Sequence, residues 1–174
     1  MFFNSIEYFL FLPAIYLIFY FTPDRFRWVV LLLGSIFFYA SLMQPYLLLV
    51  LFGVMLATYV FGKLIAARSE EKEKKRLFWI GAGINLAILV GMKYLPFITE
   101  NLDLLLKAIF GKSIIPISPV IVSIGVSFYV FQAISYLNDI YLEIQEPESH
   151  FGYFALYISF FPKILQGPIE RANS

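Results

Sequence analysis

The sequence predicts an all-α, polytopic membrane protein. Of its 174 residues, 60% are hydrophobic and 14% are charged, and the mean hydropathy is +0.79. A soluble domain holds about 45–50% apolar and about 25% charged residues. The apolar excess excludes a soluble globular domain, a disordered chain and a nucleic-acid-binding protein. The net charge of +1 implies no strongly charged partner, and the lack of cysteine excludes disulfides and a cysteine nucleophile.

The chain is expected to form a single transmembrane domain, residues 1–174, from successive apolar segments. Their approximate ranges are 6–21, 28–42, 46–67, 77–95, 120–137 and 151–166. A span needs about 20 apolar residues, so the first segment, which contains Pro13, is short. The charged stretch 68–76 is expected to be a solvated loop or a helix extension. Pro96 is expected to end the fourth segment, because proline lacks the N–H that a helix interior uses.

Two parts of the chain are not expected to cross as regular helices. Residues 99–110 are short and partly polar, and they predict an amphipathic helix at the outer surface. Its apolar positions follow helical spacing: Leu102, Leu105, Leu106 and Ile109. The last segment, 151–166, is broken by Pro162 and followed by Gly167-Pro168. It is expected to turn or re-enter, since non-helical backbone at membrane depth must lie beside protein or a wet cavity.

Small and polar residues in the fourth segment predict helix packing. Gly83, Ala87 and Gly91 recur every four residues, and small residues at that spacing let helices approach closely in lipid. We therefore expect them to face another helix. Asn85 is the one strongly polar side chain deep in this segment, and an interhelical hydrogen bond is favoured over a substrate contact.

The fifth segment carries a polar stripe. Ser123, Ser127, Ser135 and Asp139 recur at spacings of four or eight, with Phe131 in line and Gln132 beside them. Polar groups in the bilayer are costly unless satisfied, so the stripe is expected to face protein or water. These side chains are expected to hold helices together in preference to contacting substrate. No base lies beside Ser127 in the sequence, which argues against a serine nucleophile.

The basic residues predict the orientation. Six of them lie between residues 63 and 76: Lys63, Arg68, Lys72, Lys74, Lys75 and Arg76. The positive-inside rule places this loop in the cytoplasm. Counting spans backward places Arg25 and Arg27 inside as well, and the N-terminus outside. The first segment is not expected to be a signal peptide, because no basic residue precedes it.

Two motifs resemble a known family. Residues 123–141, SIGVSFYVFQAISYLNDIY, resemble the signature helix of the membrane-bound O-acyltransferase family. Residues 157–171, YISFFPKILQGPIER, resemble its second signature, a phenylalanine-proline turn followed by Gly-Pro-Ile-x-Arg. The opening, MFFNSIEYFL, is similar to the starts of bacterial members. The most similar branch contains the alginate O-acetyltransferases, which implies a location in the bacterial cytoplasmic membrane.

The resemblance implies an O-acyltransferase that moves an acyl group, acetyl in this branch, to hydroxyls of an exported cell-surface polysaccharide. The implied donor is acetyl-CoA or an acyl carrier on the cytoplasmic side, with no bound cofactor or metal. The implied partners are the lipid bilayer and extracytoplasmic polysaccharide-modifying proteins. The family's catalytic histidine is expected beyond Ser174, so this chain corresponds to the N-terminal portion and is expected to be inactive alone.

The residues carried over from the two motifs are candidates for the reaction chamber. They are Ser127, Phe128, Gln132, Asp139, Pro162, Gly167, Pro168, Glu170 and Arg171. Arg171 either anchors a carboxylate or phosphate or pairs with an acid to hold the turn. His150, the one histidine, follows acidic residues in a polar loop and is expected to be a loop residue, not the base.

Two other classes remain open. A transporter or channel fragment would also use broken helices and a polar stripe, but transporter halves repeat their broken helices, and the sequence contains no second copy of that pattern. A non-catalytic membrane scaffold is the other alternative.

Overall fold

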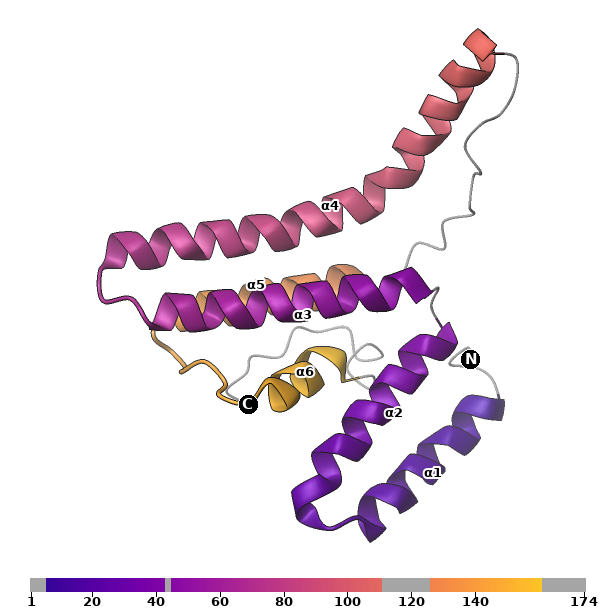
Figure 1. Cartoon of the computed structure of the whole chain (residues 1–174). Coiled ribbons are helices and arrows are strands. Elements are labelled where there is room, and N and C mark those ends of the chain that lie inside the picture. The colour runs from indigo at the N-terminus through magenta and orange to yellow at the C-terminus, as the bar shows by residue number, and fades with distance from the viewer. Residues whose placement is uncertain (1–5, 43–44, 111–125, 161–174) are drawn as a thin grey trace.

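The computed structural model describes residues 6–42, 45–110 and 126–160. Within these ranges every regular element is helical: α1 (Ile6–Phe21), a 3-10 turn η1 (Asp24–Phe26), α2 (Arg27–Leu42), α3 (Pro45–Ala66), α4 (Glu71–Phe110), α5 (Val126–Tyr141) and α6 (Phe151–Ser159) (Figure 1). The predicted all-α class is therefore confirmed for the described part of the chain.

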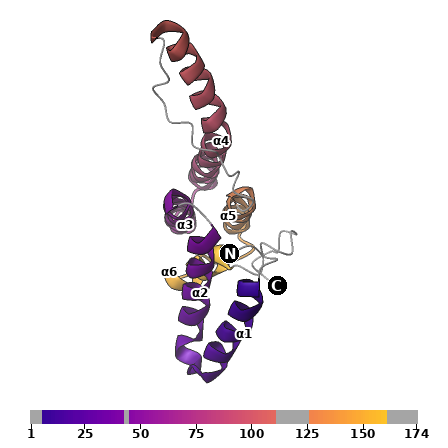
Figure 2. The same ribbon diagram turned by 90° about the vertical axis from the view of Figure 1, so that its right-hand side faces the viewer.

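Helices α3, α4 and α5 pack against one another in a group of three, and α6 packs against α2 and α3. Figure 2 looks along this group and shows α3 and α5 on two sides beneath α4, with α1 and α2 as a hairpin below. The main core lies where these elements meet. Its most deeply buried apolar residues are Val54, Ile65, Tyr129, Val130, Ala133, Leu137 and Phe154.

Among the described residues, two helices are long and apolar enough to cross a membrane. They are residues Leu47–Ala66 of α3 and Glu71–Tyr94 of α4, with 20 and 24 residues. At about 1.5 Å per residue these segments measure about 30 and 36 Å, which matches a hydrocarbon core of about 30 Å. Helix α1, with 16 residues, continues through Pro13 and is shorter than a usual span. The full set of spans predicted above stays a prediction.

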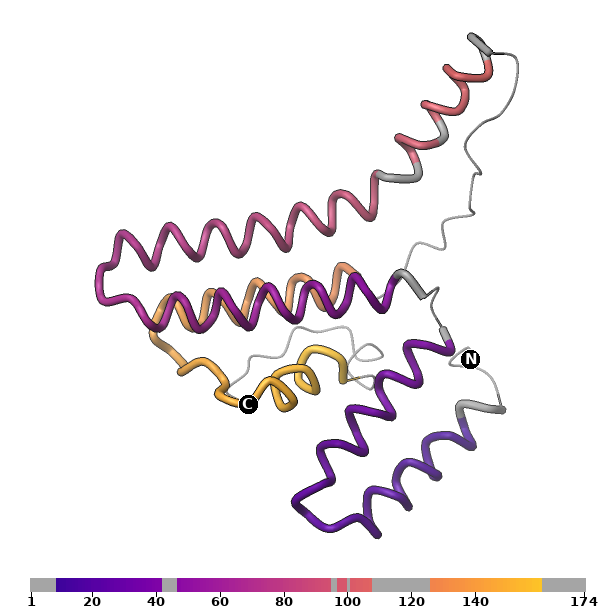
Figure 3. Tube along the Cα trace, viewed as in Figure 1, coloured from indigo at the N-terminus to yellow at the C-terminus, as the bar shows by residue number. Residues whose placement is uncertain are grey.

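The expectation that Pro96 ends the fourth segment is wrong. Helix α4 runs for 40 residues from Glu71 to Phe110 with Pro96 inside it. It bends along its length, and its second half rises away from α3 and α5 (Figures 1 and 3). Proline removes one backbone hydrogen bond and tends to kink a helix without always ending it. The charged stretch is partly the first turn of α4, where Glu71 and Glu73 suit the positive end of the helix dipole.

The separate amphipathic helix expected at 99–110 is also corrected. These residues are helical, but they continue α4. Leu102 and Leu105 are 46% and 64% exposed, whereas Asp103 is buried at 4%. In this stretch the aspartate is therefore buried, and these two leucines are exposed.

Helix α5 ends four residues later than predicted, at Tyr141 instead of near residue 137. Buried Asp139 and Ile140 extend its packed face past the expected boundary. The helix ends where Glu143 adopts φ = 58°, in the left-handed region that often follows a helix C-terminus. Helix α6 starts at Phe151 as predicted. The rest of the sixth segment, with the predicted re-entrant turn, lies outside the described residues, as do residues 120–125 of the fifth.

The predicted packing of Gly83, Ala87 and Gly91 is wrong for the described helices. All three are exposed, and a Cβ built at Gly83 or Gly91 meets nothing within 4 Å. The close approach occurs at Gly81, where a Cβ would lie 3.0 Å from Leu137 Cδ1 of α5 and 3.0 Å from Phe61 Cβ of α3. The small residue that lets three helices meet is thus Gly81.

Candidate functional site

A buried polar contact joins the two longest helices. Asn85 on α4 and Thr58 on α3 are both fully buried. The Asn85 Nδ2 donates to Thr58 Oγ1 at 3.2 Å and to the Gly81 carbonyl at 2.9 Å. The Thr58 hydroxyl lies 3.4 Å from Asn85 Oδ1 and donates to it. The predicted interhelical role of Asn85 is confirmed.

The polar stripe predicted on α5 does not share one environment. Ser127 is exposed, Phe131 is 48% exposed and Ser135 is half-buried, whereas Asp139 is 7% exposed. Residues four apart are rotated by about 40° on a helix of 3.6 residues per turn. A row with that spacing therefore winds around α5, from its exposed side at Ser127 to its buried side at Asp139. Ser123 lies outside the described residues.

The face of α5 that packs inward carries Gln132, one of the predicted candidates, together with two tyrosines that the predicted stripe did not include. It contains Tyr129, Gln132 and Tyr136, at 0%, 2% and 4% exposure. Tyr129 Oη and Gln132 Oε1 have no hydrogen-bond partner in the described structure. The spacing of these residues, three, four and seven, is the signal that could have found this face.

Gln132 connects α5 to α6. Its Nε2 donates to the carbonyl of Tyr157 at 2.9 Å. That carbonyl is near the end of α6, where the last carbonyls have no partner inside the helix. Gln132 therefore fixes the carboxyl end of α6, from which the chain continues into the second family motif. This supports the expectation that it holds helices together. Phe128, the neighbouring candidate, is half-buried on α5.

The loop between α5 and α6 is tied to the helices around it. The Tyr136 hydroxyl accepts from the Glu148 N–H at 2.9 Å. The Ser149 carbonyl accepts from the Tyr59 hydroxyl at 2.6 Å and from Lys63 Nζ at 3.4 Å. The Lys63 ammonium also lies 4.5 Å from the centre of the Tyr59 ring. Loop 142–150 is consequently held by both α3 and α5.

His150 lies in this loop, as predicted, and caps α6. Its Nδ1 accepts from the Gly152 N–H at 3.1 Å. Its ring meets the edge of Trp28 with centroids 5.1 Å apart. Trp28 comes so close that a Cβ at Gly152 would lie 2.7 Å from Trp28 Cη2. These contacts give His150 a structural role between α2 and α6.

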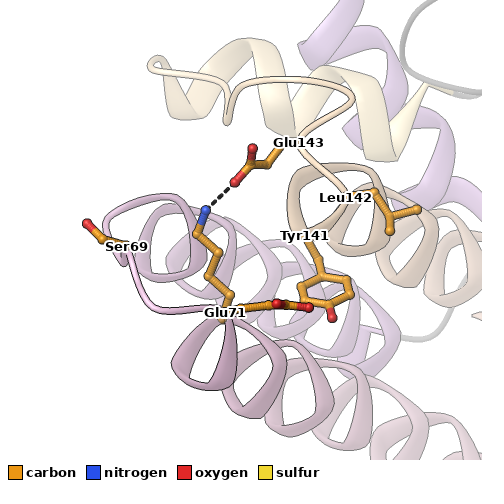
Figure 4. Close-up of a pocket in the computed structure, with 6 residues that line it drawn as sticks. Ser69, Glu71, Tyr141, Leu142 and Glu143 are labelled. Atoms are coloured by element: carbon orange, nitrogen blue, oxygen red, sulfur yellow. Dashed lines mark hydrogen bonds and ion pairs between the residues drawn. The ribbon is translucent and has the colours of Figure 1, made fainter.

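A cleft opens beside the same loop. Its volume is about 310 Å³, and it is lined by Ser69, Glu71, Lys74, Tyr141, Leu142 and Glu143. Figure 4 shows Glu143 reaching toward the lysine across the cleft, and the dashed line marks the Lys74–Glu143 ion pair. The hydrogen bond and charge of Lys74 lower the pKa of the Glu143 carboxyl below its ordinary value. The ion pair links the start of α4 to the loop that follows α5.

The two segments predicted to be cytoplasmic and loop 142–150 come together at one end of the molecule. Trp28 at the start of α2 contacts His150, Lys63 near the end of α3 bonds Ser149, and Lys74 in α4 pairs with Glu143. The structure thus places these segments at the same end of the helices. The side of the membrane that they face stays a prediction.

The candidate residues of the second family motif, residues 157–171, cannot be located in the structure. Pro162, Gly167, Pro168, Glu170 and Arg171 lie outside the described residues. Within the described ranges, no group of three or more His, Cys, Asp or Glu side chains is arranged to hold a metal ion. What the described site provides chemically is a packed support: α5 and α6 held together, and loop 142–150 fixed by polar contacts.

Similarity to known proteins extends over almost the whole chain. Over 169 residues, 97% of the chain, it is 34% identical to a Pseudomonas putida protein named "Probable alginate O-acetylase AlgI". The chain is a homologue of the alginate O-acetylases. A protein of the same name from Azotobacter vinelandii is 30% identical over 173 residues, again 97% of the chain. The resemblance to the membrane-bound O-acyltransferase family is thereby confirmed.

A third relative carries a different substrate in its name. A Helicobacter pylori protein named "Peptidoglycan O-acetyltransferase" is 29% identical over 168 residues, with 80% of this chain covered. The chain spans about a third of the length of these relatives: 34% of the first two and 30% of the third. No family model matches the chain, and no solved structure matches it.

Proposed function

We propose that this chain is part of a membrane-bound O-acyltransferase that transfers an acetyl group to hydroxyls of an exported cell-surface polysaccharide. The observation that carries this proposal is the similarity to alginate O-acetylases along 97% of the chain. The peptidoglycan enzyme among the relatives supports acetyl transfer to a polysaccharide as the shared chemistry. The protein would act in the bacterial cytoplasmic membrane, next to extracytoplasmic polysaccharide-modifying proteins.

In this proposal the described helices support the reaction and do not perform its proton transfer. An acyl donor, acetyl-CoA or an acyl carrier, approaches from the cytoplasmic side, where loop 142–150 lies. Helix α6, held by Gln132, leads directly into the motif that contains Pro162 and Arg171. Arg171 either binds an anionic part of a substrate or pairs with an acid that holds the turn.

His150 is not the base in this proposal. A general base needs a free lone pair within reach of the proton that it removes. The Nδ1 lone pair of His150 already accepts the Gly152 N–H, and the ring lies against Trp28. The chain holds no second histidine and no cysteine. The 174-residue chain alone is therefore proposed not to transfer acyl groups.

The test is polysaccharide acetylation in membranes that express the full reading frame containing these residues. Arg171→Ala should remove most of the activity. His150→Ala should keep the activity per folded molecule, but it should lower the yield of folded protein because the cap of α6 is lost. The His150→Asn variant, which restores a capping side chain, serves as the control for folding. Turnover by the 174-residue chain that His150→Ala abolishes would falsify the proposal and make His150 the base.

The proposed orientation has its own test. Single cysteines at Ser5 and Ser69 are compared for labelling by a membrane-impermeant thiol reagent in intact cells. The proposal expects Ser5→Cys to label and Ser69→Cys to stay unlabelled until the membrane is opened. The reverse pattern would invert the topology.

A further inference from the structure

The start of α4 carries a basic stripe on the side that turns away from the rest of the molecule. The basic stripe consists of Lys72, Lys75 and Arg76, followed by Trp79. All four side chains are exposed, and Trp79 is 63% exposed. Successive helix residues are rotated by about 100°, so the four fall within an arc of about 100°. Gly81 and Asn85, which face α3 and α5, lie roughly opposite this arc.

The acidic residues of the same stretch point elsewhere. Glu73 is engaged by Arg68 at 3.6 Å. Glu71 lines the cleft on the other side, with the Lys74–Glu143 ion pair. By helix geometry these two glutamates flank the basic stripe, with Glu71 about 40° from Lys75 and Glu73 about 60° from Arg76. No described residue forms an ion pair with Lys72, Lys75 or Arg76. The stripe therefore presents positive charge that the described chain does not neutralise.

The height of the stripe matches the surface of a bilayer. The candidate span Glu71–Tyr94 has 24 residues, and its first six are the charged run Glu71–Arg76. The apolar remainder, from Leu77 to Tyr94, measures about 27 Å at 1.5 Å per residue. This nearly fills a hydrocarbon core of about 30 Å, so the charged first residues of α4 lie at headgroup level. Tryptophan prefers the same interfacial layer, and lysine and arginine extend their charges toward it. Below Trp79 the face continues with exposed apolar residues, Leu86 and Val90.

We propose that the basic stripe of α4 is a binding site for the headgroup of an anionic phospholipid. The phosphate of the lipid lies between Lys72, Lys75 and Arg76, the Trp79 ring lies at the glycerol level, and the acyl chains follow the apolar face below. Charge complementarity selects the occupant, because a zwitterionic headgroup leaves the three cations uncompensated. The site depends on membrane insertion of α4 and not on acyl transfer.

The experiment counts bound lipids on the full-length protein by native mass spectrometry, in detergent with equal phosphatidylglycerol and phosphatidylcholine. The unmodified protein is expected to retain phosphatidylglycerol preferentially. Lys72→Gln/Lys75→Gln should reduce that preference by about thirtyfold, given the attraction of about 1 kcal/mol that each basic residue near a membrane surface contributes. The matched control is Lys93→Gln/Lys107→Gln, which removes the same charge from exposed positions of the same helix and should leave the preference unchanged.

Two further arms make the result decisive. Lys72→Arg/Lys75→Arg keeps the charge and should keep the preference, so a loss there would overturn the charge argument. Raising the salt should weaken retention, because exposed charges are screened. An unchanged preference in Lys72→Gln/Lys75→Gln, or an equal loss in the control, would overturn the proposal. Displacement of the lipid by an equal concentration of inorganic phosphate would also overturn it, because the site would then be one for a small anion.

Discussion

Gly81 and Gly83 provide a matched pair of substitutions on one helix. Gly81→Ala places a methyl group 3.0 Å from Leu137 Cδ1 and from both Cβ and Cγ of Phe61. Two of these atoms lie next to the α3 backbone, so α3 itself must move. Overpacking of this kind costs about 1–3 kcal/mol. Alanine is a better helix former than glycine, and this preference offsets the cost by about 1 kcal/mol in the free energy of unfolding. Gly81→Ala should therefore lower the free energy of unfolding by about 0–2 kcal/mol.

Gly83→Ala isolates the helix preference, because a Cβ there meets nothing within 4 Å. Its expected effect is a gain of up to about 1 kcal/mol. The two variants should thus differ by about 1–3 kcal/mol in the free energy of unfolding, with Gly83→Ala the more stable. Steric-trapping unfolding in bicelles measures this difference. Equal destabilisation by both would refute the reasoning and show that Gly83 also packs against a helix, as the four-residue spacing predicts.

Three more outcomes are expected from the polar contacts. In a double-mutant cycle, Thr58→Ala and Asn85→Ala should couple by about 0.6 kcal/mol, and by no more than about 1.7 kcal/mol, as for other hydrogen bonds within membranes; additivity would contradict the contact. Gln132→Leu should remove the hydrogen bond to the Tyr157 carbonyl and weaken α6 docking by about 0.5–1.5 kcal/mol. Faster amide exchange in residues 151–159 would report this loss, whereas the exposed substitution Ser127→Ala should leave that exchange unchanged. The pKa of Glu143 is lowered by its lysine partner, so the ion pair stabilises the loop at neutral pH and is lost as pH falls through that lowered pKa. The protection of the loop amides, corrected for the pH dependence of intrinsic exchange, should fall over the same pH range in the unmodified protein, and Glu143→Gln should abolish that change.

Local chemistry was enough to predict several features correctly. The apolar runs located α1, α2, α3 and the start of α6 to within one or two residues, because a helix in an apolar setting needs only continuous apolar sequence. The isolation of Asn85 in an apolar segment predicted its interhelical bond, since a polar group there must find a partner. The two motifs predicted the family that the relatives confirm.

By itself, then, the sequence determined the helical class, most helix positions and the family. Only the tertiary structure decided which side of each helix packs inward. In a soluble protein the apolar side of a helix marks its packed face, but here both sides are apolar, as the exposed Ile84 and Leu86 beside buried Asn85 illustrate. The choice therefore depends on close fit between helices, and that fit selected Gly81 over Gly83. The continuation of α4 through Pro96 could not be predicted from the local sequence either, because a proline is compatible with a kinked helix as well as with a helix end.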